Sequence, residues 1–336
     1  IENVEPQTLD LTLVQEPILS PLAFPGKVLA DQNYLFISDS GHHRIVVSSL
    51  DGAILHVIGT GKAGLLDGSF SEAQFFSPQG LAFNQNLLYV ADTGNHAIRE
   101  IDLAKQTVTT IAGDSSQNRN LYPHCGKRIS LNSPWDLVLN RDRLLIAIAG
   151  SHQIWEMQLE TGILQTFAGT GAEGNFDGAI HEAAFAQPSG IATDGQTLFI
   201  ADSETSSIRA INTDQVRTIC GSGSLYDFGD VDGIGESARL QHCLGIEFAH
   251  NALWIADTYN HKIKRLDLET YECKTVLDGF SEPSGLSATQ DDLYIADTNH
   301  HVIQKVELRS LELTTLEFPN LCAPNVCFPT KNRDIP

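Results

Sequence analysis

An Asp followed four residues later by a His recurs along the chain, and both residue types can take part in chemistry. Imidazole is a common metal ligand, so a group of such His could hold a metal. An Asp at a strand end can instead accept backbone N–H bonds across a turn, and the His N–H as well, which would clamp the turn. We interpret the repeated residues as structural turn clamps. They are Asp39, His43, Asp92, His96, His152, Asp202, Asp257, His261, Asp297 and His301.

These residues stand at one point of a repeat that occurs six times. In the second copy, Pro78 opens a short apolar strand, a second strand ends at Asp92, and residues 98–103 alternate apolar and polar side chains before a Thr-rich fourth strand at 107–111. The second strands of the six copies end at 39, 92, 148, 202, 257 and 297, with Ile148 in place of the Asp in the third. Short strands joined by turns at this pitch predict an all-β fold, a six-bladed β-propeller of four-stranded antiparallel blades.

The connections between the copies share a face of such a propeller with the Asp-containing turns. Three of them, at 59–75, 169–185 and 221–240, carry a Gly-x-Gly, an Asp-Gly and then a short segment that ends in Phe or Leu. We expect that segment to form one helical turn whose apolar residue fastens the loop to the blade. Because loops on a rigid scaffold often carry function, we expect this face to be the functional one.

Two of the six copies break the pattern where the first strands approach the axis. The Gly of the Pro-x-Gly motif is replaced by Lys27 in the first copy and by Asp136, next to Trp135, in the third. These residues predict either an ion pair at the channel rim or a polar anchor for a partner. The loop after the second copy also departs from the pattern, so Tyr122, His124, Lys127 and Arg128 are further partner-binding residues in this interpretation.

The composition limits the partners. The chain has 42 acidic and 21 basic residues, a formal net charge of −21, which disfavours nucleic acid and anionic membranes. No apolar run is long enough to span a bilayer. No signal peptide is visible at the N-terminus. The compartment is not assigned from the sequence; a soluble protein of the cytoplasm is favoured, with the periplasm and the thylakoid lumen as alternatives. For Cys322 and Cys327, two thiols are favoured over a local disulfide.

Residues 92–98 and 257–263 resemble the NHL repeat, named for its Asn-His-Leu signature. With the interblade loops, the resemblance covers about 24–319 and extends to the propeller that follows a thioredoxin-like domain in bacterial, plant-lumenal and animal NHL proteins. It implies a non-catalytic protein-interaction scaffold that works with a thioredoxin-like domain or partner in redox-linked regulation. We expect the chain to be a monomer. Residues 1–23 would then be a lead-in segment and 320–336 a C-terminal tail.

Two other functions stay open on the same fold, because a fold does not decide a function. A metal-dependent propeller enzyme, of the lactonase or lyase type, would need inward-facing ligands on the first strands, where the sequence offers Gly, Lys and Asp but no His cluster. An RNA-binding module is opposed by the charge. We therefore predict no catalytic residues and no cofactor, with Ca or Zn as the alternatives to test.

Overall fold

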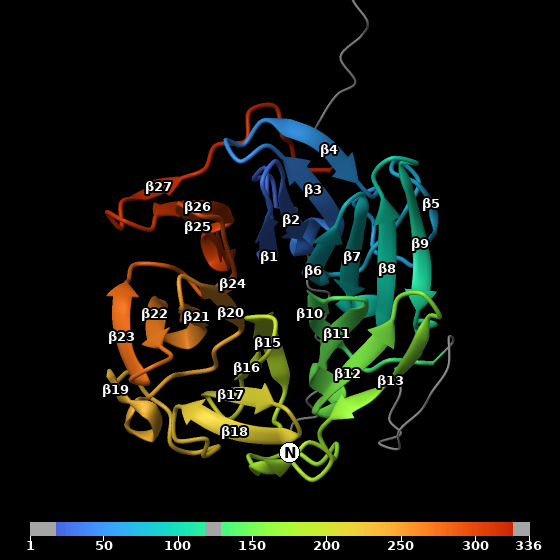
Figure 1. The fold of residues 1–336 in the computed structure, drawn as a ribbon. Coiled ribbons are helices and arrows are strands. Elements are labelled where there is room, and N and C mark those ends of the chain that lie inside the picture. The colour runs from blue at the N-terminus through green and yellow to red at the C-terminus, as the bar shows by residue number, and fades with distance from the viewer. Residues whose placement is uncertain (1–17, 118–128, 325–336) are drawn as a thin grey trace, which may run out of the picture.

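The computed structural model describes residues 18–117 and 129–324, and it contains six small antiparallel sheets arranged as blades around a central axis (Figure 1). This confirms the six-bladed propeller. From the axis outwards, the blades are formed by the following strands: blade 1 by β1 (Pro25–Ala30), β2 (Leu35–Asp39), β3 (Arg44–Ser48) and β4 (Ile54–Ile58); blade 2 by β6 (Pro78–Asn84), β7 (Leu87–Asp92), β8 (Ala97–Asp102) and β9 (Thr107–Ala112); blade 3 by β10 (Pro134–Asn140), β11 (Arg143–Ile148), β12 (Gln153–Gln158) and β13 (Ile163–Ala168).

Blades 4 to 6 repeat the same order: blade 4 has β15 (Pro188–Thr193), β16 (Leu198–Asp202), β17 (Ser207–Asn212) and β18 (Gln215–Cys220); blade 5 has β20 (Gly245–Ala249), β21 (Ala252–Asp257), β22 (Lys262–Asp267) and β23 (Glu272–Leu277); blade 6 has β24 (Pro283–Ala288), β25 (Asp292–Asp297), β26 (Val302–Glu307) and β27 (Leu313–Thr315). Blades 2, 4 and 5 each gain a two-residue outer strand from the preceding interblade loop, namely β5 (Gly68–Ser69), β14 (Gly178–Ala179) and β19 (Gly233–Ile234).

The hydrophobic core is divided among the junctions between neighbouring blades. Phe36 and Val47 of blade 1, for example, pack with Leu88 and Val90 of blade 2, and an equivalent cluster fills each of the other junctions. The interblade loops add to these clusters, because Phe75, Phe185 and Leu240 are fully buried. The loops with a regular pattern are therefore anchored parts of the blades.

The ring closes where blade 6 meets blade 1, and each of these two blades is built from one end of the chain. Tyr294 and Ile303 pack against Val28 and Ile37. Ser284 Oγ donates to the carbonyl oxygen of Gly26 at 2.6 Å, and Thr298 Oγ1 donates to that of Pro25 at 2.9 Å. Among residues 18–117 and 129–324, side-chain packing and a few hydrogen bonds therefore hold this junction.

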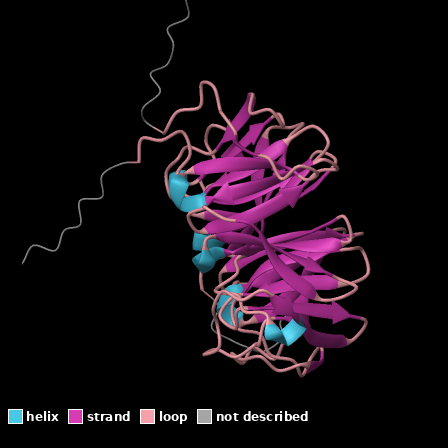
Figure 2. Ribbon diagram, turned by 90° about the vertical axis from the view of Figure 1, so that its left-hand side faces the viewer, coloured by secondary structure: helices cyan, strands magenta, loops and turns pink. Residues whose placement is uncertain are grey.

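The turns between the second and third strands lie on one face of the disc, where their 3₁₀ turns form a row along one side of the molecule (Figure 2). We call this the Asp-turn face. Its turns are η1 (Ser40–His42), η2 (Thr93–Asn95), η3 (Ala149–Ser151), η5 (Thr258–Asn260) and η6 (Thr298–His300), with the turn of blade 4 at 202–206; η4 (Gly235–Ser237) lies in the loop before blade 5.

Within residues 18–117 and 129–324, no helix is long and apolar enough to cross a membrane.

The cysteines differ in their state. Cys322 is disulfide-bonded, so the interpretation of this residue as a free thiol was wrong. Cys220, Cys243 and Cys273 are free and buried in the core between blades 4 and 5.

Candidate functional site: the Asp-turn face and the central channel

The carboxylates of the turn Asp residues are buried and hold two segments together. In each of the five blades that have the Asp, its Oδ1 accepts the backbone N–H of the residue 16 positions earlier, always at 2.7 Å. Its Oδ2 contacts the side chain three residues later, which is His42, Asn95, Thr205, Asn260 or His300. The expectation that the His four residues after the Asp donates to it was therefore wrong.

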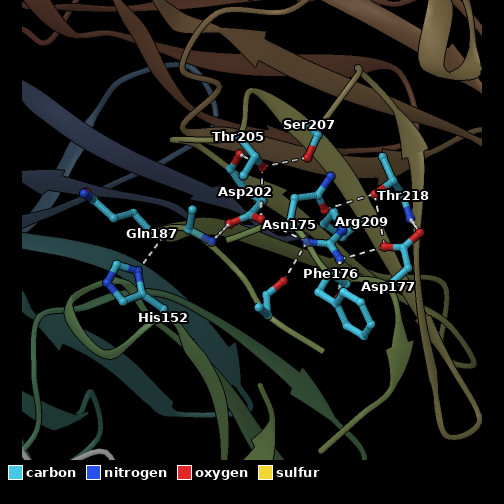
Figure 3. Close-up of polar contacts among 12 residues, drawn as sticks. His152, Asn175, Phe176, Asp177, Gln187, Asp202, Thr205, Ser207, Arg209 and Thr218 are labelled. Atoms are coloured by element: carbon cyan, nitrogen blue, oxygen red, sulfur yellow. Dashed lines mark hydrogen bonds and ion pairs between the residues drawn. The ribbon is translucent and has the colours of Figure 1, made fainter. Parts of the chain in front are cut away.

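A buried cation completes the carboxylate network in blades 2, 4 and 5. In blade 4, Arg209 joins Asp202 at 3.1 Å to Asp177 of the preceding loop at 2.7 Å (Figure 3). Arg99 joins Asp92 and Asp67 in the same way, and Lys264 does so for Asp257 and Asp232. The side chains of the three cations are fully buried. Sequence reasoning missed these networks, although the Asp-Gly motif and the Arg or Lys both recur in the repeat.

Burial sets the protonation behaviour of this network. Removal from water raises the pKa of Asp202 to about 6, and the neighbouring Arg209 opposes that rise. Burial likewise raises the pKa of Asp257 to about 6 and raises that of Asp92. A carboxylate that is shut away from solvent and paired internally can stabilise the fold, but it offers no group to a substrate.

The turn His residues connect neighbouring blades. Nδ1 of His43, His96, His152, His261 and His301 accepts a backbone N–H from the start of the next blade, at 3.0 to 3.2 Å. Figure 3 shows one such bond, from Gln187 to His152. Accepting at Nδ1 requires a neutral imidazole whose proton is on Nε2. Burial favours the neutral ring, because it lowers the pKa of His43, His96, His152 and His301. The bond between His301 and Phe24 lies at the ring closure.

Blade 4 has Ser206 where the other blades have this His. Ser206 Oγ accepts the N–H of His242 at 3.0 Å, so the interblade hydrogen bond is kept while the ring is missing. Ser206 also keeps the left-handed backbone conformation of the His residues, with φ 48° against 49 to 60°. The substitution therefore removes volume from this junction and leaves its backbone unchanged.

Lys27 and Asp136 form an ion pair across the channel. Lys27 Nζ donates to Asp136 Oδ2 at 2.9 Å and to the carbonyl oxygens of Ser189 and Leu244 at 3.2 and 2.8 Å. Both residues are buried, at 4% and 8% exposure. Burial raises the pKa of Asp136, and Lys27 opposes this rise. All three ammonium donors are thus used within the protein, and blades 1, 3, 4 and 5 are tied together at the axis.

The equivalent position is Gly in the other four blades because the neighbouring backbone is close. A Cβ on Gly80 would lie 2.4 Å from the Cα of Asp136, and one on Gly285 would lie 2.6 Å from the Cα of Lys27. The two side chains that do occur at this level are therefore the two that pair with each other.

Two cavities lie along the channel. One of about 280 Å³ opens between the Asp turns and is lined in part by Phe24, Gln79 and Trp135. The other, of about 220 Å³, contacts the ion pair and is lined mainly by aliphatic side chains and Glu247. Burial raises the pKa of Glu247 to about 8. Of the three residues expected at the rim, Trp135 lines the open mouth, whereas Lys27 and Asp136 lie deeper.

Comparison with known proteins identifies the repeat. Residues 75–101 match the family model described as NHL repeat. NHL repeat-containing protein 2 from Gallus gallus is 40% identical over 353 residues, and the Homo sapiens protein is 40% identical over 349 residues. Protein SUPPRESSOR OF QUENCHING 1, chloroplastic, from Arabidopsis thaliana is 43% identical over 335 residues. The chain is an NHL-repeat β-propeller.

The NHL propeller corresponds to only part of these relatives. Their alignments cover 88 to 90% of this chain but 49, 48 and 32% of the respective relatives. Among solved structures, the nidogen/laminin complex matches with a TM-score of 0.59 at 17% identity, over 85% of this chain and 93% of that one. A catalytically inactive virginiamycin B lyase from Staphylococcus aureus with quinupristin matches with 0.56 at 12%, over 94% and 88%. At these identities the structures show the fold alone.

The Asp-turn face of this NHL propeller exposes aromatic side chains. They are Phe24, Phe76, Tyr226, Phe228 and Tyr259, with exposed fractions of 39, 42, 91, 54 and 47%. Sequence reasoning did not single them out, because their exposure depends on how the loops fold back. Tyr122, His124, Lys127 and Arg128, which it did single out, lie outside the described residues. Within the described ranges, no group of three or more His, Cys, Asp or Glu is placed to hold a metal ion.

Proposed function

We propose that this NHL propeller is a protein-interaction module, that its Asp-turn face docks the partner, and that the partner is a thioredoxin-like domain in redox-linked regulation. The observation that carries the proposal is the set of aromatic side chains exposed on that face. Aromatic residues supply much of the binding energy in protein interfaces, because they bury a large apolar area at little cost in conformational entropy.

The charged side chains of the turns and of the axis are paired within the protein, and this supports binding rather than catalysis. In the networks at Asp92, Asp202 and Asp257, the carboxylates are buried and paired with Arg99, Arg209 and Lys264. At the axis, Lys27 has its three donors occupied. A metal-dependent lactonase or lyase would need free ligands pointing into the channel, and the described residues bring together no such group. The net charge of −21 weighs against RNA.

The choice of a thioredoxin-like partner rests on the resemblance to propellers that follow such a domain. The animal relatives are about twice as long as the matched region, since the alignment covers 49% of the Gallus gallus protein. A partner domain in the same polypeptide or in a separate one would meet the same face.

The test is calorimetric titration of the chain with a purified thioredoxin-like domain encoded in the same genome. We expect the variant Phe24→Ser with Phe76→Ser to bind at least tenfold more weakly, which corresponds to about 1.4 kcal/mol of lost apolar burial. Both side chains are partly exposed, so the fold should tolerate the change.

A matched control carries the same kind of change elsewhere. Leu55 of β4 and Ile163 of β13 lie on outer strands and are 45 and 38% exposed. Leu55→Ser with Ile163→Ser should bind like the unmodified chain. No binding by the unmodified chain would refute the thioredoxin-like partner, and an equal loss in both variants would refute the Asp-turn face as its docking site.

A further inference from the structure

Blade 4 leaves a hollow at the position where the other blades have an imidazole. In the equivalent junctions, His43 and His301 fill this space and pack edge-on against Phe76 and Phe24, with ring centroids 5.4 and 4.4 Å apart. At the junction of blades 4 and 5 the residue is Ser206, and a cavity of about 180 Å³ is present. It is lined mainly by Glu204, Ser206, Leu225, Phe228, His242 and Tyr259.

The hollow carries negative charge, because Glu204 lines it and Glu282 acts on His242 from nearby. Within the described ranges, no Lys or Arg forms an ion pair with Glu204 or Glu282. The ion-pair contact of Glu204 is with His242 Nδ1 at 3.7 Å. Burial lowers the pKa of His242, although Glu204 and Glu282 both oppose this shift, so the ring is mainly neutral at pH 7. Among the described residues, no Lys or Arg is therefore paired with either carboxylate.

The walls of the hollow provide flat aromatic surfaces beside that charge. The rings of His242 and Tyr259 stack with centroids 4.5 Å apart and planes at 11°. Phe228 is 54% exposed on the opposite loop, and the neighbouring Tyr226 is 91% exposed. A planar cation is the group that matches both features, because guanidinium stacks on aromatic faces and forms paired hydrogen bonds with a carboxylate.

We propose that this hollow receives the side chain of an Arg from a basic segment of a protein partner. The Arg would stack against the aromatic wall and pair with Glu204, in the space that His fills in the other blades. The net charge of −21 would increase the long-range attraction between this chain and the basic segment. The proposal rests on the proposed interaction function and specifies the chemistry of one part of the Asp-turn face.

The probes are three blocked hexapeptides of Gly and Ser with one Arg, Lys or citrulline at the same position. They are titrated into the isotope-labelled chain, and backbone amide shifts are followed by NMR. We expect the Arg peptide to shift the amides of Glu204, Ser206 and His242, with citrulline binding at least tenfold more weakly because it lacks the charge. Lys should bind more weakly than Arg because its ammonium cannot stack as a planar group.

Two variants separate shape from charge. Ser206→His restores the repeat residue at a compatible backbone conformation, so it should fold normally and abolish Arg binding by filling the hollow. Glu204→Gln keeps the shape and should weaken Arg binding about tenfold. Equal binding of Arg and citrulline, or unchanged Arg binding in both variants, would overturn the proposal. Phe24 and Phe76 are absent from the lining of the hollow, so failure here is distinguishable from failure of the thioredoxin-like partner test.

Discussion

Blades 3 and 4 hold the same turn with different chemistry. In blade 4, Arg209 joins two carboxylates beneath the turn. In blade 3, Ile148 replaces the Asp and Trp155 replaces the Arg, and the Trp155 indole N–H donates to Gln153 at 3.0 Å. Gln153 in turn donates to the carbonyl oxygen of Gly169 at 3.1 Å. The residue that ends the turn has the same left-handed conformation in both, with His152 and Ser206 at φ 55° and 48°.

The turn therefore requires backbone partners and a filled interior, and either charged or neutral side chains can supply them. The Asp and His of the repeat are therefore one solution to a packing problem. A charged solution has a particular weakness, however. Removing one member of a buried ion pair leaves the other without a partner, and this costs more than the pair contributes to stability. The charged and neutral blades should thus respond differently to mutation.

Arg209→Met should have the largest effect. It leaves Asp202 buried without its cation and removes the link to Asp177, so we expect a loss of about 3–5 kcal/mol in the free energy of unfolding. Urea titration followed by circular dichroism measures this loss. Arg143→Met in blade 3 is the matched control, because Arg143 pairs with Glu156 at 2.7 Å but keeps 34% of its side chain exposed. That variant should lose less than about 1 kcal/mol. Equal losses would mean that burial of the pair is unimportant.

Lys27→Met extends the comparison from the turns to the axis. It removes three hydrogen bonds and leaves Asp136 buried opposite an apolar side chain, so a loss of about 2–4 kcal/mol is expected. Adding Asp136→Asn removes the unpaired charge and keeps one acceptor oxygen where the carboxylate accepted the N–H groups of both Leu137 and Ile191. The double variant should recover part of that loss in thermal unfolding. If the double variant loses as much stability as the two single variants added together, Lys27 and Asp136 are not coupled.

How much of the fold and of the site could be predicted from the sequence depended on which features recur in the repeat. The fold followed from features that recur in every copy, namely strand length, apolar alternation and the turn at 39, 92, 148, 202, 257 and 297. Lys27 and Asp136 were found because they replace Gly at one repeat position. Their pairing across the axis was only one of two alternatives, since it depends on the spacing of blades 1 and 3.

Other parts of the site depend on contacts that no repeat position records. Asp177 reaches Arg209 because its loop runs down the outer edge of blade 4, where β14 pairs with β18. The hollow at Ser206 exists because the loop carrying Leu225 and Phe228 folds beside it without filling it. The missing His was visible in the sequence, but the shape around it was not.

The smallest effect is expected at His152 of blade 3, the position where blade 4 has Ser206. His152→Ser copies blade 4 and should lower the free energy of unfolding by about 1–2 kcal/mol at pH 8, because the ring is lost while a hydroxyl can still accept the N–H of Gln187. Burial lowers the pKa of His152 below its ordinary 6.5, so between the two values the unfolded chain binds the proton that the folded chain excludes. The stability that His152 provides is therefore complete above pH 6.5 and decreases as the pH falls. The difference between the two proteins should shrink from pH 8 to pH 5, whereas His181→Ser, at an exposed position, should show no such trend. A difference that stays constant over this range would show that the interblade bond does not require neutral imidazole.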